Sequence, residues 1–113
     1  MDMARIVYEG PVNVGTDLDD ATEIDLQPGD GARFGVPTGS SLDGETVVVH
    51  EKINGTWYAA QGASAAASQA VAASKSYPIP VTANCSVKIK LVCSALGDVA
   101  EVDLIVKSMD SRS

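Results

Sequence analysis

Apolar and polar residues alternate over short stretches of this chain, which is the pattern of β-strands with one buried face. The clearest stretch covers residues 85–93, and its apolar positions are Cys85, Val87, Ile89, Leu91 and Cys93. The positions between them include Lys88 and Lys90. Because successive side chains of a strand point to opposite faces, this segment should bury its apolar residues and expose its lysines. We therefore predict a half-buried strand over residues 85–93.

A second alternating segment follows after the turn-forming sequence Ala-Leu-Gly-Asp. It covers residues 101–107 and has apolar residues at every second position. We expect this strand to pair antiparallel with the strand at 85–93. Its acidic residues Glu101 and Asp103 would then lie across from the lysines of that strand, where opposite charges stabilise a sheet.

The dipeptide Asn54-Gly55 separates two strand-like segments within residues 45–60. Both central residues of a type I′ turn need a positive φ, which Asn and Gly adopt readily, so the sequence predicts a tight β-hairpin here. The hairpin carries the only tryptophan of the chain, Trp57, which we expect to be the largest single anchor of the core.

Other short segments complete the predicted set of strands. They are residues 6–14, 24–26, 33–36 and 77–81. Prolines interrupt the first and last of these. Since proline cannot donate a hydrogen bond to a neighbouring strand, the first should be an edge strand or contain a bend, and the last should be an edge strand or an irregular extended segment. Turn signals such as Gln-Pro-Gly-Asp-Gly recur about every 8–12 residues. The sequence predicts an all-β fold: a single β-sandwich or jelly-roll-like domain of about seven or eight mostly antiparallel strands.

A chain of 113 residues fits one domain. Residues 1–15 are expected to form an N-terminal arm or edge strand, residues 16–107 the sandwich, and residues 108–113 a flexible tail. The Ala- and Ser-rich stretch 61–76 is interpreted as a loop followed by a small-residue strand near Gln69–Ala73. A short helix is the alternative, since Ala has the highest helix propensity.

The balance of charge excludes several classes of partner. Fifteen acidic residues outnumber eight basic ones, which gives a formal net charge of −7. A protein that binds nucleic acid or an anionic membrane needs clustered Lys and Arg, and no basic stripe appears along the sequence. No apolar run approaches the roughly 20 residues of a membrane-spanning helix, and the first residues lack the apolar region of a signal peptide. We therefore expect a protein that is made in a cytoplasm and binds neither nucleic acid nor membrane.

Residues suited to catalysis or metal binding are few. His50 is the only histidine, and it would need a nucleophile and an acid from elsewhere in the fold. Cys85 and Cys93 are about 26 Å apart on a continuous strand, too far for a disulfide, and we interpret both as small buried thiols. The aspartates within residues 17–20 lack the ligand spacing of a calcium-binding loop. We predict no catalytic residue, no cofactor and no metal, and a protein that is not an enzyme.

Two motifs flank the Ala- and Ser-rich stretch. An alternating Val strand leads to Asn-Gly-Thr-Trp at residues 54–57, and Tyr-Pro-Ile-Pro-Val at residues 77–81 leads to the final pair of strands. Together they resemble small β-sandwich structural proteins of tailed bacteriophages, over roughly residues 45–107. The chain departs from that pattern at Asn54, where Asp is usual, and by its long Ala/Ser insert. The residues before 45 carry no such resemblance.

The resemblance implies a virion structural protein, a group that includes capsid decoration (cement) proteins, head fibres and tail components. We expect a decoration subunit that is made in the host cytoplasm and stabilises the assembled shell. Its partners would be the major capsid protein and copies of itself, as in the trimers that such proteins often form. The alternative is a glycan- or receptor-binding module of a phage fibre or tail.

Candidate contact residues follow from the thin core that the composition predicts. With one Phe, one Trp and three Tyr, we expect the chain to be only marginally stable alone and to bury further surface by association with a partner. The candidates are Ile6, Tyr8, Val12 and Val14 in the N-terminal segment and Ala65, Ala66 and Val71 in the Ala/Ser stretch. For the glycan-binding alternative, an exposed aromatic ring would stack on the sugar, and the candidates are Tyr58 and Tyr77.

Overall fold

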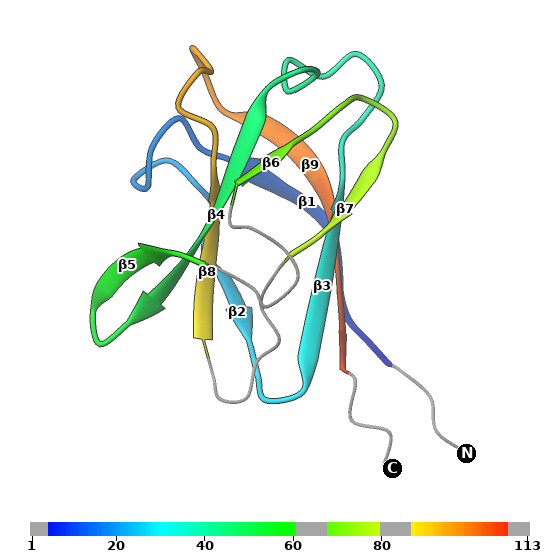
Figure 1. The fold of residues 1–113 in the computed structure, drawn as a ribbon. Coiled ribbons are helices and arrows are strands. Elements are labelled where there is room, and N and C mark those ends of the chain that lie inside the picture. The colour runs from blue at the N-terminus through cyan, green and yellow to red at the C-terminus, as the bar shows by residue number, and fades with distance from the viewer. Residues whose placement is uncertain (1–4, 61–67, 80–86, 109–113) are drawn as a thin grey trace.

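The computed structural model describes residues 5–60, 68–79 and 87–108, which form nine strands in two sheets (Figure 1). The strands are β1 Arg5–Val14, β2 Ile24–Leu26, β3 Asp30–Gly35, β4 Thr46–Ile53, β5 Thr56–Ala59, β6 Ser68–Ala70, β7 Ser76–Pro78, β8 Val87–Val92 and β9 Ala100–Ser108. The predicted all-β sandwich is confirmed. The described residues form nine strands, slightly more than the seven or eight expected.

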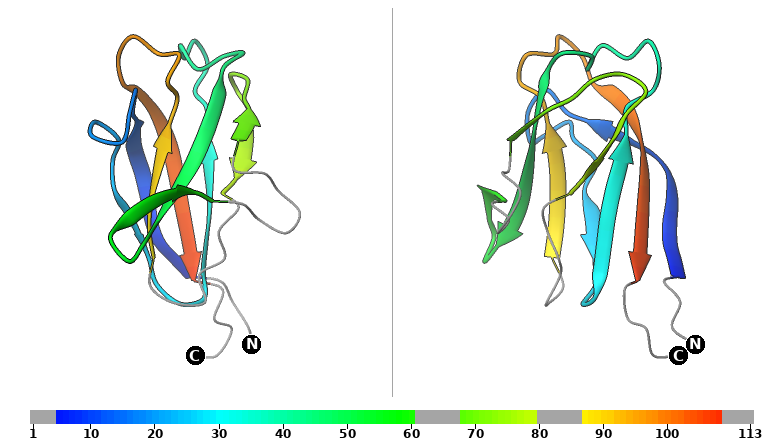
Figure 2. Two further views of the ribbon diagram at one scale, coloured as in Figure 1. Left: turned by 60° about the vertical axis from the view of Figure 1, so that its left-hand side comes forward. Right: turned by 45° about the vertical axis from the view of Figure 1, so that its right-hand side comes forward.

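The two sheets pack face to face (Figure 2). The first sheet has the order β1-β9-β3-β7, and the second has the order β2-β8-β4-β5, with β6 also paired to β4. All strand pairs within the sheets are antiparallel. The proline-containing strands β1 and β7 are both edge strands, as predicted, since the outer side of an edge strand needs no donor for a ladder.

The core lies between the sheets and consists of aliphatic side chains, one phenylalanine and the thiol of Cys93. Its fully buried large residues are Phe34, Leu26, Leu42, Ile89, Leu91, Leu104, Val14, Val47, Val49, Val102 and Val106. The expectation that Trp57 anchors this core was wrong. Trp57 pairs with Lys52 across β4 and β5, and Lys52 lies on the face opposite Val47 and Val49. The indole therefore points outward and is only half-buried.

Two predicted turns are confirmed by their backbone geometry. Asn54 and Gly55 have φ of 52° and 80°, as a type I′ turn between β4 and β5 requires. Between β2 and β3, Gly29 has φ of 87° and the Asp30 N–H donates to the Gln27 carbonyl over 3.0 Å. The buried Asp30 carboxylate also accepts from the Gln27 N–H at 2.9 Å, which closes this turn from both sides.

The predicted pairing of the last two strands was wrong. β8 lies between β2 and β4 in the second sheet, whereas β9 lies between β1 and β3 in the first. Glu101 and Asp103 are therefore not across from the lysines of β8; Asp103 pairs with Pro11 and Gly35 instead. Each of these strands has one apolar face, and placing them in opposite sheets directs both faces into the shared core.

The end of β1 links the two sheets, which makes the N-terminal segment part of the sandwich rather than a free arm. The Gly15 N–H donates to the Leu91 carbonyl at 3.0 Å, and its carbonyl accepts from the Cys93 N–H at 2.8 Å. A Cβ at Gly15 would lie 2.5 Å from the Asp17 carbonyl and 2.6 Å from the Ala21 nitrogen. Only glycine fits at this crossing point.

Three further predictions concern cysteines, the Ala/Ser stretch and the tail. Cys93 is a buried free thiol, as predicted, and Cys85 lies outside the described residues. In the stretch 61–76, the small-residue strand predicted near 69–73 is confirmed only in part, because β6 covers Ser68–Ala70 and residues 71–73 lie beyond its end. Residues 61–67 lie outside the described residues, and so does the predicted tail 108–113 except Ser108, which is the last residue of β9.

Candidate interaction surfaces

The outer face of the second sheet carries a group of cationic side chains around one indole. We call it the basic face and define it by His50, Lys52, Trp57, Lys88 and Lys90. The strand register brings them together, since Lys52 is opposite both Trp57 on β5 and Lys88 on β8, and His50 is opposite Lys90. The three lysines are close in space although β4 and β8 are far apart in the sequence.

Trp57 holds two of these lysines by cation–π contacts. The Nζ of Lys90 lies 5.1 Å from the ring centroid, and the Nζ of Lys52 lies 5.7 Å from it. Contacts of this kind contribute roughly 0.5–1 kcal/mol each at partly exposed sites. The indole is thus covered by ammonium groups and not by the core.

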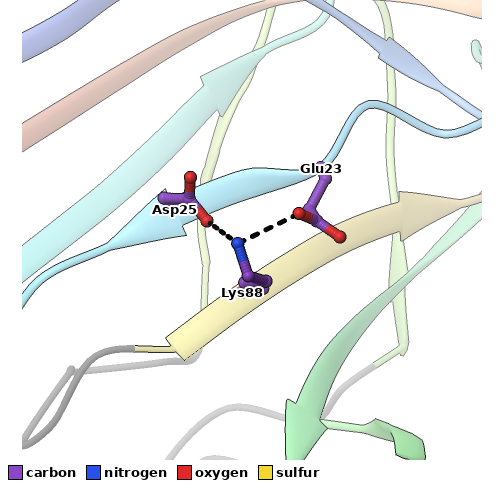
Figure 3. Close-up of polar contacts among 3 residues, drawn as sticks. All are labelled: Glu23, Asp25 and Lys88. Atoms are coloured by element: carbon purple, nitrogen blue, oxygen red, sulfur yellow. Dashed lines mark hydrogen bonds and ion pairs between the residues drawn. The ribbon is translucent and has the colours of Figure 1, made fainter. Parts of the chain in front are cut away.

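Lys88 forms the carboxylate-paired corner of the basic face (Figure 3). Its Nζ lies 2.8 Å from Asp25 Oδ1 on β2 and 3.2 Å from Glu23 Oε2, just before that strand. The hydrogen bonds to Asp25 and then to Glu23 raise the pKa of the Lys88 ammonium above its usual value. All three side chains are well exposed, so we assign the cluster a role in local charge balance rather than in stability.

The other two lysines have no carboxylate partner within the part of the chain that the structure describes. Lys90 donates to the Leu18 carbonyl at 2.6 Å, and Lys52 rests on the indole. Beside Lys90, the Nδ1 of His50 is buried and finds no hydrogen-bond partner among the described residues. Two ammonium groups therefore remain available for an external anion.

Exposed apolar residues gather at two places among the described residues. The first is the start of β1, where Ile6, Val7 and Tyr8 are 52%, 51% and 42% exposed. The second is the β4–β5 hairpin, where Ile53 and Tyr58 are 52% and 53% exposed. This hairpin extends sideways from the body of the sandwich, so no strand of the first sheet covers it (Figures 1 and 2).

An apolar groove of about 250 Å³ lies beside the start of β1. Its apolar lining residues are Val7, Tyr8, Val12, Ile24, Leu104 and Val106. The pairing of β1 with β9 shifts between Ile6 and Tyr8, a bulge that aims Val7 at this groove. The Tyr8 ring extends forward along β1 over Gly10, and its hydroxyl donates to the Pro11 carbonyl at 2.9 Å. Because β1 and β2 are edge strands of different sheets and both line the groove, it opens between the edges of the two sheets.

The contact residues predicted from the sequence fall into three groups. Ile6 and Tyr8 are exposed, as a contact role requires. Val12, Val14 and Val71 were assigned wrongly, because they are 6%, 0% and 3% exposed and fill the core of the subunit itself. Ala65 and Ala66 lie outside the described residues.

The two tyrosines proposed as a glycan platform are in different sheets. Tyr58 is exposed on β5 in the second sheet. Tyr77 on β7 in the first sheet packs against Phe34 with ring centroids 5.7 Å apart, and its hydroxyl accepts from the Ala72 N–H at 2.8 Å. Tyr77 thus has a structural role, and Tyr58 alone keeps an open ring.

Sequence reasoning missed the basic face, although part of its signal was visible. The alternation already placed His50 and Lys52 on one side of their strand and the two lysines of β8 on the polar side of theirs. The sequence pattern did not indicate that β4 and β8 are neighbours in the sheet. Within the described residues, no group of His, Cys, Asp and Glu side chains gathers to hold a metal ion, and no helix is long and apolar enough to cross a membrane.

Comparisons with protein-family models, with curated proteins and with solved structures found no match to this chain. The interaction surfaces above must therefore be interpreted from their own chemistry.

Proposed function

We propose that this protein is a structural subunit of a tailed-bacteriophage particle, most specifically a decoration subunit that binds and stabilises the assembled capsid. The observation that carries the proposal is the gathering of exposed large apolar residues at two projecting edges, the start of β1 and the β4–β5 hairpin. Exposed apolar residues that cluster in this way are typical of surfaces that contact other proteins. The assignment to a phage particle is supported by the sequence motifs at residues 54–57 and 77–81, which resemble phage structural proteins.

The physical role of such a subunit is a linkage effect. A protein that binds only the assembled shell lowers the free energy of that state, and the stabilisation grows with the subunit's concentration relative to its Kd. The apolar groove and the edge strand β1 supply contacts suited to this role, since an edge strand has unpaired backbone groups on its outer side. No reactive group is needed.

The proposal is tested by adding the purified chain to capsid shells assembled from the major capsid gene nearest to its own gene. We expect co-sedimentation with the shells and a higher melting temperature of the shells that carry it. Mass photometry of the free chain should show an oligomer. A monomer that leaves shells unbound and their melting unchanged would contradict the proposal.

A second candidate is a glycan- or receptor-binding module of a fibre or tail, and the open ring of Tyr58 on the projecting hairpin favours it. This function predicts saturable binding on a glycan array that is lost in Tyr58→Ala. Tyr77→Ala is not a useful second variant, because Tyr77 supports Phe34 in the core.

A further inference from the structure

The basic face concentrates positive charge on a strongly acidic protein. Three of its eight basic residues, Lys52, Lys88 and Lys90, lie on this single face together with the only histidine. We propose that the basic face is a docking surface for a carboxylate-rich segment of a partner protein. The inference deepens the proposed function and rests on it, since such a segment on the shell surface would orient the decoration subunit.

Like charges face one another across the basic face. Lys52 is directly opposite Lys88 on the neighbouring strands β4 and β8, and Lys90 follows Lys88 by two residues on the same face of β8. Like charges at such positions destabilise a sheet. The chain has fifteen acidic residues that could neutralise this face, yet only Glu23 and Asp25 at its margin pair with a lysine among the described residues. The remaining positive charge is therefore complementary to an external anion.

The side chains of Lys52 and Lys90 are held in place by contacts within the protein. Both ammonium groups lie over the Trp57 ring, and Lys90 is fixed further by the Leu18 carbonyl. A lysine whose side chain is already ordered loses less conformational entropy when it binds. The Trp57 ring thus orders two lysine side chains before a partner binds.

The contacts of Trp57 bear on the kind of anion that the basic face would bind. A sugar would stack on an open indole face, but the ammonium groups already lie over the ring of Trp57. Lysine ammoniums act as compact point charges that pair with carboxylates. These observations favour an Asp- or Glu-rich protein segment over an acidic glycan.

Net charge adds a consequence for specificity. A chain of charge −7 repels an acidic partner from most directions, so that a productive encounter requires the basic face to point toward the partner. The interaction should weaken as salt rises, because the Debye length falls to about 8 Å at physiological ionic strength.

The experiment uses the single tryptophan as its reporter. The full chain is titrated with hexaglutamate at low salt, and binding is followed by Trp57 fluorescence and by the indole N–H signal in NMR spectra. We expect saturable changes that are absent with hexaglutamine. The double variant K52Q/K90Q should raise the Kd about tenfold, as the loss of two partly exposed ion pairs implies.

The matched control is K75Q/K107Q, which changes the net charge equally but removes exposed lysines outside the basic face. It should leave the Kd within about twofold, given the small effect of distant screened charges. Thermal unfolding of both double variants checks that each is folded. Equal Kd values for the two double variants, or no response of Trp57 to hexaglutamate, would overturn the proposal.

A heparin hexasaccharide forms the third arm of the experiment. If it binds more tightly than hexaglutamate and loses affinity in K52Q/K90Q, the face is a glycan site and the proposal is wrong. Co-sedimentation of wild type and K52Q/K90Q with shells separates this inference from the proposed function. If wild type and K52Q/K90Q both bind shells equally, the proposed function stands but the basic face takes no part in it. If the chain responds to hexaglutamate but does not bind shells, the basic face binds carboxylates and the proposed function is wrong.

Discussion

The two ends of β4 both carry apolar residues of the same parity but have different surroundings. In the first half, Val47 and Val49 are fully buried between the sheets, whereas Ile53 at the other end of the strand has the same parity and is 52% exposed. The difference arises because the β4–β5 hairpin continues beyond the first sheet (Figure 1). An apolar residue in this protein therefore has a structural role only where the opposite sheet covers it, and the uncovered ones are free to contact a partner.

The largest expected effect separates the body from the hairpin directly. Leu91→Ala removes a fully buried side chain and should lower the free energy of unfolding by about 2–5 kcal/mol, through lost burial and the cavity left behind. Ile53→Ala should lower it by less than about 1 kcal/mol, since the side chain is half-exposed. Urea unfolding measures both. Similar losses for the two variants would show that the hairpin is packed as tightly as the body.

A second comparison contrasts two glycines in the connections between strands. Gly15→Ala should destabilise the fold by roughly 1–3 kcal/mol, because the added Cβ would clash with backbone atoms where β1 crosses to the second sheet. Gly97→Ala is the matched control, since no atom lies within 4 Å of its Cβ position, and it should be close to neutral. If thermal melting finds the two variants equal, the crossing at Gly15 is not the tight point that its geometry indicates.

The turn of the projecting hairpin gives a smaller effect. Gly55→Ala places a Cβ at φ of 80° and should cost about 1–2 kcal/mol, the usual penalty of a left-handed conformation. Because the hairpin is only partly packed, we expect the damage to appear as faster hydrogen exchange confined to β5 and the end of β4. Faster exchange spread over the whole second sheet would contradict this local picture.

The smallest effect concerns the acidic loop that follows Gly15. The Thr16 hydroxyl donates to Asp20 at 2.7 Å and the Asp17 N–H donates at 3.1 Å, which lowers the pKa of the Asp20 carboxyl below 3.8. A carboxyl with a lower pKa in the folded state stabilises the fold above its unfolded pKa, and this contribution is lost as the pH falls through the folded value. Asp20→Asn should therefore reduce stability at neutral pH slightly and show a smaller loss of stability below about pH 4. Parallel pH profiles of the two proteins would contradict the assignment.

Local features of the fold were predictable because their causes lie within a few residues. The turns at Asn54-Gly55 and before Asp30 were correctly predicted. Asn-Gly favours a positive φ and Pro-Gly favours a turn in any structural context. The alternation in β8 likewise identified its buried face. These are properties of short segments, and tertiary contacts confirm them without changing them.

The errors share a different cause. Trp57 was expected in the core because of its size, but the register of β4 and β5 directs it outward beside Lys52. The interpretation of Val12 as a contact residue failed because β1 is paired within the sheet, which turns that side chain inward. The basic face was predicted only in part for the same reason, since its lysines come from β4 and β8, which are far apart in the sequence.

The sequence by itself determined the strands, their faces and their turns, because side-chain alternation and backbone preferences act over two to four residues. The tertiary structure decided which strands are neighbours and which faces are covered. It placed β8 and β9 in opposite sheets, left the hairpin uncovered and assembled the basic face from β4, β5 and β8. Those outcomes depend on burying many distant apolar faces at once, and no short segment of the chain contains that information.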